Sequence, residues 1–190
     1  MVKTEPEKPS KPETPEVKVA SVKLAKTSYV YDGKVKKPAV VAKNNKGEKI
    51  TSKDYTVKYA AGCKNVGTYT VKVTFKGDYK GTFIKTFNIN PKGTSLSKVK
   101  AARKSFSATW KKQSKQTSGY QLQYSTNKKF AKSVKTSTIS KNTTVKKTVK
   151  KLSAKKTYYV RVRTYKNVKV GKKTVNLYSG WSKVKAVKTK

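Results

Sequence analysis

Groups that perform acid–base, nucleophilic or metal chemistry are scarce in this sequence. The chain has no histidine, one cysteine and eight aspartates and glutamates. Four of the acids lie in the first 16 residues, and the others are far apart along the chain: Asp32, Glu48, Asp54 and Asp78. Catalysis and hard-metal binding need several such groups close together. We therefore expect no enzyme, no metal site and no cofactor, and we interpret these four acids as turn residues that cap backbone N–H groups.

Cys63 has no partner for the usual chemistry of a thiol. A single cysteine cannot form an internal disulfide, and without histidine the chain lacks the usual base that activates a cysteine nucleophile. The residue lies in a turn-like segment, Ala60 to Asn65, that contains Gly62. We expect a small structural residue in this turn.

Positive charge dominates the composition. Lysine and arginine number 48, the formal net charge is +40, and no acid follows Asp78. Only Arg103, Arg161 and Arg163 are arginines, although sequence-specific nucleic-acid recognition favours arginine. The lysines are spread along both halves of the chain. Two interpretations stay open: a solvated coat that keeps the protein soluble, or a functional surface for anionic polymers such as teichoic acids or sulfated glycans.

The order of turns and apolar residues predicts an all-β protein of two domains. Residues 1–16, with prolines at 6, 9, 12 and 15, favour an extended linker. In residues 17–90, alternation at Tyr55-Val57-Tyr59 and Tyr69-Val71-Val73-Phe75 predicts half-buried strands. In residues 91–190, the same period appears at Phe106-Ala108-Trp110, Tyr120-Leu122-Tyr124 and Tyr158-Val160-Val162. No segment favours a helix, and no apolar run is long enough to span a bilayer.

Residues 17–90 carry a family resemblance. Tyr31-Asp32-Gly33, Asn65-Val66-Gly67-Thr68-Tyr69 and Gly77-x-Tyr79-x-Gly81 are similar to motifs of the Ig-like repeats of bacterial surface proteins. The resemblance implies a β-sandwich that acts as a spacer or adhesive unit. It implies no particular binding residue.

Residues 91–190 resemble a fibronectin type III domain. Leu152-Ser153-Ala154-Lys155-Lys156-Thr157-Tyr158 has the spacing of the tyrosine corner of that family. The resemblance further implies that Trp110 is the core tryptophan of the second strand and that Trp181-Ser182 leads the last strand. Family members serve in adhesion proteins and as spacers, and the resemblance implies no specific ligand here.

One local pattern predicts a binding surface. The residues that alternate with Tyr158, Val160 and Val162 combine aromatic rings with guanidinium groups, and the family's strand order would place two glutamines beside them. Such a mixture stacks sugars or grips anions; it also simply covers a central strand with good β-formers. The predicted site consists of Tyr159, Arg161, Arg163, Tyr165, Gln121 and Gln123.

The combined expectation is a non-catalytic spacer or adhesive module of an extracellular, Gram-positive bacterial surface protein. We expect a monomer that contacts an anionic cell-wall polymer or a host glycan or protein, without membrane insertion. Signal and anchor segments would lie outside this chain. The alternatives are a dedicated polyanion-binding protein, whose ligand is a heparin-like glycan, teichoic acid or nucleic acid, and an accessory module of a secreted glycan hydrolase.

Overall fold

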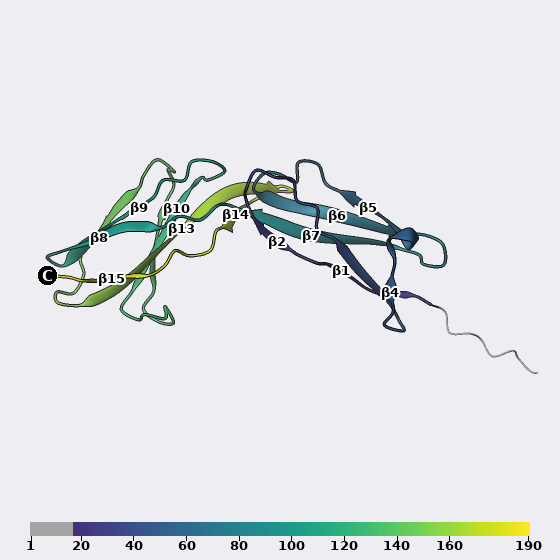
Figure 1. Ribbon diagram of the computed structural model, residues 1–190. Coiled ribbons are helices and arrows are strands. Elements are labelled where there is room, and N and C mark those ends of the chain that lie inside the picture. The colour runs from purple at the N-terminus through teal and green to yellow at the C-terminus, as the bar shows by residue number, and fades with distance from the viewer. Residues whose placement is uncertain (1–16) are drawn as a thin grey trace, which may run out of the picture.

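The computed structural model describes residues 17–190, which form two β-sandwiches placed end to end (Figure 1). The predicted linker, residues 1–16, lies outside the described residues. The strands of the first domain are β1 (Val19–Leu24), β2 (Ser28–Val30), β3 (Val40–Asn44), β4 (Lys49–Ile50), β5 (Tyr55–Tyr59), β6 (Gly67–Phe75) and β7 (Thr82–Asn90). Those of the second domain are β8 (Leu96–Ala102), β9 (Ser105–Trp110), β10 (Gly119–Ser125), β11 (Lys135–Ile139), β12 (Lys146–Val149), β13 (Thr157–Val170), β14 (Lys173–Tyr178) and β15 (Lys185–Lys188). The predicted all-β class is confirmed.

One expectation about local structure was wrong. A single turn of 3-10 helix, Ser52–Asp54, connects β4 to β5, where the sequence suggested no helix at all. The Asp54 N–H donates to the Thr51 carbonyl (3.1 Å), and the Thr51 hydroxyl donates to the Asp54 carboxylate (2.8 Å). The side chain thus closes a tight connection that hydrophobic periodicity cannot reveal. Within residues 17–190, no helix is long and apolar enough to cross a membrane.

The first domain packs a three-stranded sheet against a four-stranded one. The sheet orders are β1-β3-β4 and β2-β7-β6-β5, and the short strand β2 pairs in parallel with β7. The predicted inward faces are confirmed: Val71, Val73 and Phe75 of β6 are buried, and β5 lays its alternate residues against the same core. Gly62 and Gly77 have positive φ in the connections on either side of β6, as their turn contexts predicted.

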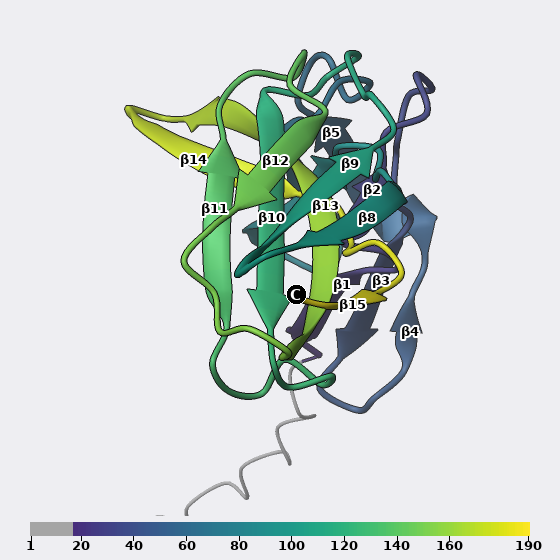
Figure 2. The ribbon, with the colours of Figure 1, turned by 90° about the vertical axis from the view of Figure 1, so that its left-hand side faces the viewer.

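The second domain has the same layered design with different strand orders. One sheet is β12-β9-β8; the other is β11-β10-β13-β14, with β15 also paired to β13 (Figure 2). All three predicted strand phases are confirmed, because Phe106, Trp110, Tyr120, Leu122 and the inward face of β13 are buried in one cluster. Trp110 packs against Tyr120 with ring centroids 5.4 Å apart.

The tyrosine corner forms as the sequence indicated. Tyr158 is buried, and its ring packs near Phe106 and Tyr124, each with a centroid separation of 6.3 Å. Its hydroxyl accepts a hydrogen bond from the backbone N–H of Ser153 at 3.2 Å. The chain crossing between β12 and β13 is therefore fixed by one buried polar contact.

The joint between the domains is short and well bonded. Five residues separate β7 from β8; among them Pro91 is fully buried, and the Lys92 carbonyl accepts a hydrogen bond from the Thr164 hydroxyl at 2.8 Å. Gln116 reaches across the joint from the second domain. Its Oε1 accepts the Val66 N–H at 3.2 Å, and its Nε2 donates to Asn65 Oδ1 at 3.4 Å. These contacts hold the two domains in one orientation.

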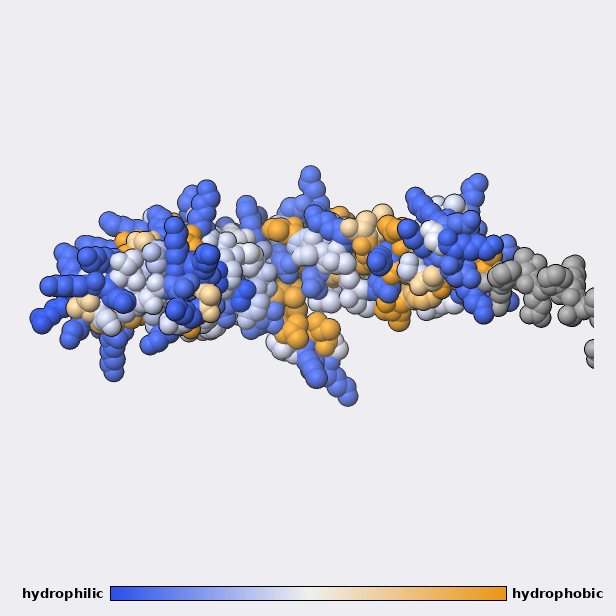
Figure 3. Space-filling model, turned by 90° about the horizontal axis from the view of Figure 1, so that it is seen from below, coloured by the Kyte–Doolittle hydropathy of each residue, from blue (hydrophilic) through white to orange (hydrophobic). Residues whose placement is uncertain are grey.

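A β-hairpin projects sideways near this joint. It consists of the ends of β13 and β14, residues 166–177, which continue pairing beyond the main sheet (Figure 2). The register places Val168 and Val175 opposite each other, with Val170 and Leu177 on the same face. Lysines occupy its tip, so the hairpin appears as an apolar lobe with a charged end (Figure 3).

Candidate binding surface

The predicted pairing of arginines with glutamines is present on the outer face of the larger sheet of the second domain. In the register between β10 and β13, Gln121 lies opposite Arg163 and Gln123 opposite Arg161. Gln121 Oε1 accepts from Arg163 Nε (2.9 Å) and Nη2 (2.7 Å), and Gln123 Oε1 accepts in the same way from Arg161 (3.0 and 2.7 Å). Each glutamine therefore fixes the plane of one guanidinium group.

Two aromatic rings lie close to each of these guanidinium groups. The Arg161 guanidinium carbon lies 4.0 Å from the ring centroid of Phe130 and 4.5 Å from that of Trp181. The Arg163 carbon lies 4.2 Å from Trp181 and 3.8 Å from Tyr178. The result is a five-layer stack, which we call the Arg–aromatic stack: Phe130, Arg161, Trp181, Arg163 and Tyr178. All five side chains are partly buried.

Two serines place Trp181 in the middle of this stack. The segment between β14 and β15 runs along the edge of β13, where the Ser179 hydroxyl accepts the Thr164 N–H (3.1 Å) and the Ser182 hydroxyl accepts the Val162 N–H (3.0 Å). The backbone N–H groups of the same serines donate back to the carbonyls of Thr164 and Val162. Because both ends of the segment are bonded, the indole is fixed over the outer face of β13.

Desolvation changes the electrostatics of the stack. Partial burial lowers the pKa of both guanidinium groups, and for Arg163 the neighbouring charge of Arg161 lowers it further. Arginine starts so far above neutrality that both groups stay charged. The glutamine oxygens and the ring faces thus stabilise two like charges that lie side by side without any carboxylate partner.

The structure brings four of the six predicted site residues together and places the other two at the margin. Tyr159 is partly buried on the same strand face, opposite Ser125 and Ala186. Tyr165 was expected on the exposed face, and this was wrong: it is only 5% exposed. It is buried because its ring packs against Tyr178 (6.1 Å) and against Gly119, which has no side chain to keep it away.

Phe130, Tyr178 and the role of Trp181 were missed by the sequence prediction. Trp181 was expected to lead the last strand, whereas β15 begins only at Lys185. The sequence shows two serines, Ser179 and Ser182, on either side of the tryptophan, but their bonds to Thr164 and Val162 of β13 cannot be read from that spacing. No comparable pattern points to Phe130, which lies in a loop.

The geometry limits what the stack can bind. Two rings already lie against each guanidinium group, so a sugar would have to compete with an aromatic side chain to stack there. The contacts described above are intramolecular, and their direct effect is to tie the loop after β10 and the segment before β15 to the central strand. The stack is first of all a stabilising element.

In the first domain, Cys63 and Asp32 each contact their own local partners. Cys63 is buried, and its thiol lies 3.0 Å from the Ala60 carbonyl; burial raises the pKa of this thiol. Asp32 accepts the Lys34 N–H (2.8 Å) and pairs with the Lys36 ammonium (2.5 Å), which lowers the pKa of the carboxyl. Within residues 17–190, no group of three or more His, Cys, Asp or Glu side chains could hold a metal ion.

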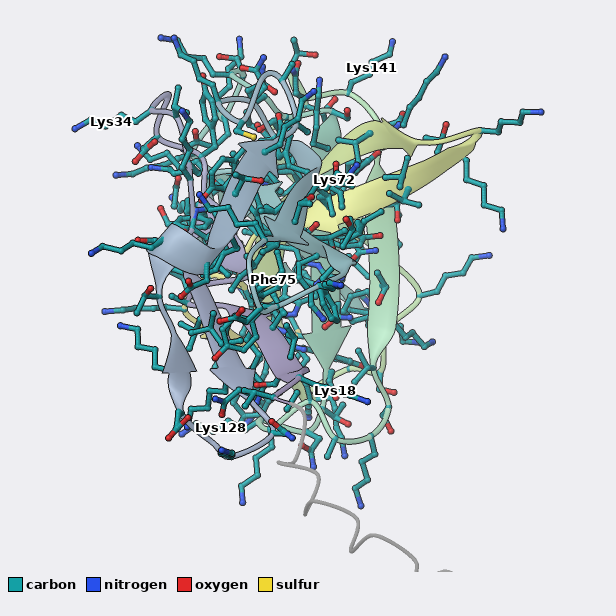
Figure 4. The ribbon with its side chains drawn as sticks, turned by 90° about the vertical axis from the view of Figure 1, so that its right-hand side faces the viewer. Lys18, Lys34, Lys72, Phe75, Lys128 and Lys141 are labelled. Atoms are coloured by element: carbon teal, nitrogen blue, oxygen red, sulfur yellow. The ribbon has the colours of Figure 1, made fainter. Side chains whose placement is uncertain are left out.

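Lysines coat the molecule on all sides. Residues 91–190 contain 29 lysines and arginines and no acid. Viewed along the long axis, the ammonium groups radiate outward around the periphery, as Lys34 and Lys141 illustrate (Figure 4). On the face seen in Figure 3, hydrophilic side chains predominate over the second domain, and larger apolar areas show on the first domain and near the joint.

Comparison with known proteins supports the assignment of the domains. Residues 90–179 match the family model described as "Fibronectin type III domain". The preceding domain is Ig-like in its β-sandwich topology. No curated protein matches the sequence.

Among solved structures, the chain is similar to domains FN1–FN3 of chicken CNTN1, with 15% identity over 90% of this chain and 67% of that one, at a TM-score of 0.44. It is also similar to a β-1,2-glucanase from Parabacteroides distasonis, with 13% identity, 63% and 17% coverage and a TM-score of 0.39. Domains A168–A170 of titin give 16% identity, 90% and 66% coverage and a TM-score of 0.36.

Proposed function

We propose that this Ig-like domain and the fibronectin type III domain that follows it form a non-catalytic spacer and adhesive module of an extracellular bacterial surface protein. The observation that carries the proposal is the joint. A buried proline, a bond from Thr164 to the linker carbonyl and the two contacts of Gln116 hold the domains in series. A spacer must be rigid, so that the segments attached to its two ends are kept apart.

The orientation of the domains can be measured by NMR relaxation of the backbone amides. We expect both domains to report one shared rotational diffusion tensor. A Gln116→Ala variant removes two hydrogen bonds of about 0.5–1.5 kcal/mol each, and should give two partly independent domains. Gln113→Ala is the matched control, because the hydrogen bonds of Gln113 to Tyr120 are made by its backbone and survive the change. Independent tumbling of the two domains in the unaltered protein contradicts the spacer proposal.

The adhesive part of the proposal depends on the lysine coat. Twenty-nine basic residues without an acid in residues 91–190 create a positive field that attracts anionic polymers and falls off over a Debye length of about 8 Å at physiological ionic strength. We propose anionic cell-wall polymers or host glycans as the partners. Immobilised teichoic acid and a sulfated glycan provide the test, and loss of all binding at about 0.15 M salt argues against adhesion by charge.

The same charge supports a second candidate, a protein whose whole task is polyanion binding. The two candidates differ in selectivity. A purely electrostatic binder should rank teichoic acid, sulfated glycan and DNA by charge density alone, with a steep dependence on salt. Preference for one polymer at equal charge favours the adhesive module. The parent open reading frame provides an independent check, because a secretion signal with a wall anchor, or a catalytic glycan hydrolase domain, would identify the context.

A further inference from the structure

A groove of about 680 Å³ runs between the two domains, and its lining includes an apolar and aromatic surface, lysines and one carboxylate. The first domain contributes Val30, Tyr31 and Asp32, and the second contributes the loop after β9. The lysines of the groove are Lys92, Lys112 and Lys115. Clefts between domains are preferred places for ligand sites, because two independent surfaces converge there.

The wall from the second domain is held in place by its neighbours. The Gln113 N–H donates to the Tyr120 hydroxyl at 2.8 Å, and that hydroxyl in turn donates to the Asn142 carbonyl at 2.9 Å. Three residues on, Gln116 bonds to the first domain across the joint. Lys112 and Lys115 therefore project from a loop whose backbone is held by Tyr120 and whose Gln116 is bonded to the first domain. Because this loop is already ordered, little conformational entropy is lost when a ligand binds.

The positive charges of the groove lysines are not neutralised by acids in the lining of the groove. Its single carboxylate, Asp32, is already engaged by the Lys36 ammonium and the Lys34 N–H. Lys92, Lys112 and Lys115 are all solvent-exposed, and the second domain has no acid to pair with them. The groove thus presents three ammonium groups to a ligand. It also presents the carboxylate of Asp32, which accepts hydrogen bonds but repels anions.

The apolar part of the lining favours a ring. Val30 is 60% exposed, which is high for a valine beside a domain joint, and Tyr31 is partly exposed next to it. An aliphatic and aromatic surface packs against the C–H face of a pyranose, while ammonium groups pair with its anionic substituents. Asp32 accepts hydrogen bonds from hydroxyl groups, which a sugar has and a phosphodiester backbone lacks at most positions.

We propose that this groove is a binding site for an acidic polysaccharide, with a sugar ring over Val30 and Tyr31 and its carboxylate or sulfate groups on Lys92, Lys112 and Lys115. The proposal deepens the adhesive part of the proposed function and rests on it. It goes further by locating the site at the joint, so that only the correctly oriented pair of domains binds.

The test compares two double variants of the whole 190-residue chain with the same charge change. Lys112→Ser with Lys115→Ser alters the groove. Lys128→Ser with Lys129→Ser is the control, because this exposed pair follows β10 at the end of the domain opposite the joint. The probe is a polygalacturonate oligomer in about 0.15 M salt, with dextran as the neutral sugar and a polyphosphate of equal charge as the non-sugar anion.

We expect the groove variant to weaken polygalacturonate binding at least tenfold and the control variant less than twofold. Equal losses in the two variants overturn the groove while leaving adhesion by diffuse charge intact. Tighter binding of polyphosphate with the same dependence on Lys112 and Lys115 overturns the sugar assignment. No binding by the unaltered protein overturns both the groove and the adhesive proposal, whereas the spacer proposal is decided separately by the relaxation measurement. Unchanged tryptophan emission verifies that each variant is folded.

Discussion

Removing the central ring of the Arg–aromatic stack should strongly destabilise the second domain. Trp181→Ala eliminates two cation–π contacts, at 4.5 and 4.2 Å, each of about 0.5–1 kcal/mol at a partly exposed site. It also exposes apolar surface that the indole covers. Roughly half of the 150–250 Å² that an aromatic side chain buries, at about 25 cal/mol per Å², contributes roughly 2–3 kcal/mol. The free energy of unfolding should therefore fall by about 3–5 kcal/mol, which is also the usual range for Trp→Ala.

Tryptophan fluorescence measures this change for one domain alone, because both tryptophans, Trp110 and Trp181, lie in the second domain. Trp110 remains as the reporter in the variant. Urea is the suitable denaturant, since an ionic denaturant would screen the positive charges. At a urea slope of about 1.5 kcal/mol per M, the midpoint should fall by roughly 2–3 M. Trp181→Phe, which keeps a ring between the guanidiniums, should lose less than half as much.

A loss below about 1 kcal/mol in Trp181→Ala would refute the reasoning. It would mean that the guanidiniums are equally stable when hydrated. The glutamine contacts to Arg161 and Arg163 would then hold the outer face without the rings.

Three further predictions concern a hydroxyl group, the surface charge and a thiol. Tyr158→Phe keeps the ring and loses the bond from the Ser153 N–H, so the second domain should lose about 1 kcal/mol in the same urea assay; no measurable loss argues against the tyrosine corner. Raising the salt concentration from about 0.02 to 0.2 M should increase the urea midpoint, because 29 like charges repel less when screened, and a lower midpoint would contradict this. Burial raises the pKa of Cys63 above its usual 9.0, so the stabilisation of the first domain that this thiol provides is complete below pH 9 and is lost as the pH rises through the folded value. The ratio of the thiol-labelling rates of folded and urea-unfolded protein should accordingly rise above pH 9, and a constant ratio would show that the buried thiol is not coupled to folding.

Strand phase and turn positions could be predicted from the sequence because both depend on local residue type. Burial of every second residue follows from the pleat, so Val71 and Val73, or Val160 and Val162, identify their inward face without knowledge of the partner strand. The tyrosine corner was predictable for a different reason, since Leu152 and Tyr158 belong to one continuous segment. The 3-10 turn was missed because its stabilising contact is a single side-chain bond.

Only the part of the site that lies on the paired strands β10 and β13 could be predicted from the sequence. The register between β10 and β13 places Gln121 and Gln123 beside the arginines, as the strand order indicated. The rings that complete the stack come from a loop and from the segment before β15, whose positions depend on the tertiary fold. Tyr165 is buried because the neighbouring strands place Tyr178 against its ring and the bare backbone of Gly119 beside it, and strand alternation alone does not reveal such neighbours.

The serial arrangement also determines how the module would respond to tension. β1 begins at the far end of the first domain, and the C-terminal residue lies at the far end of the second, so a pull on the two ends acts along the long axis (Figure 1). β15 runs roughly along that axis and is hydrogen-bonded to the start of β13 through four residue pairs, from Thr157–Lys188 to Val160–Lys185. Force applied there loads these bonds in shear, so they share the load instead of opening one after another. β15 should thereby act as a mechanical clamp when force is applied along the long axis.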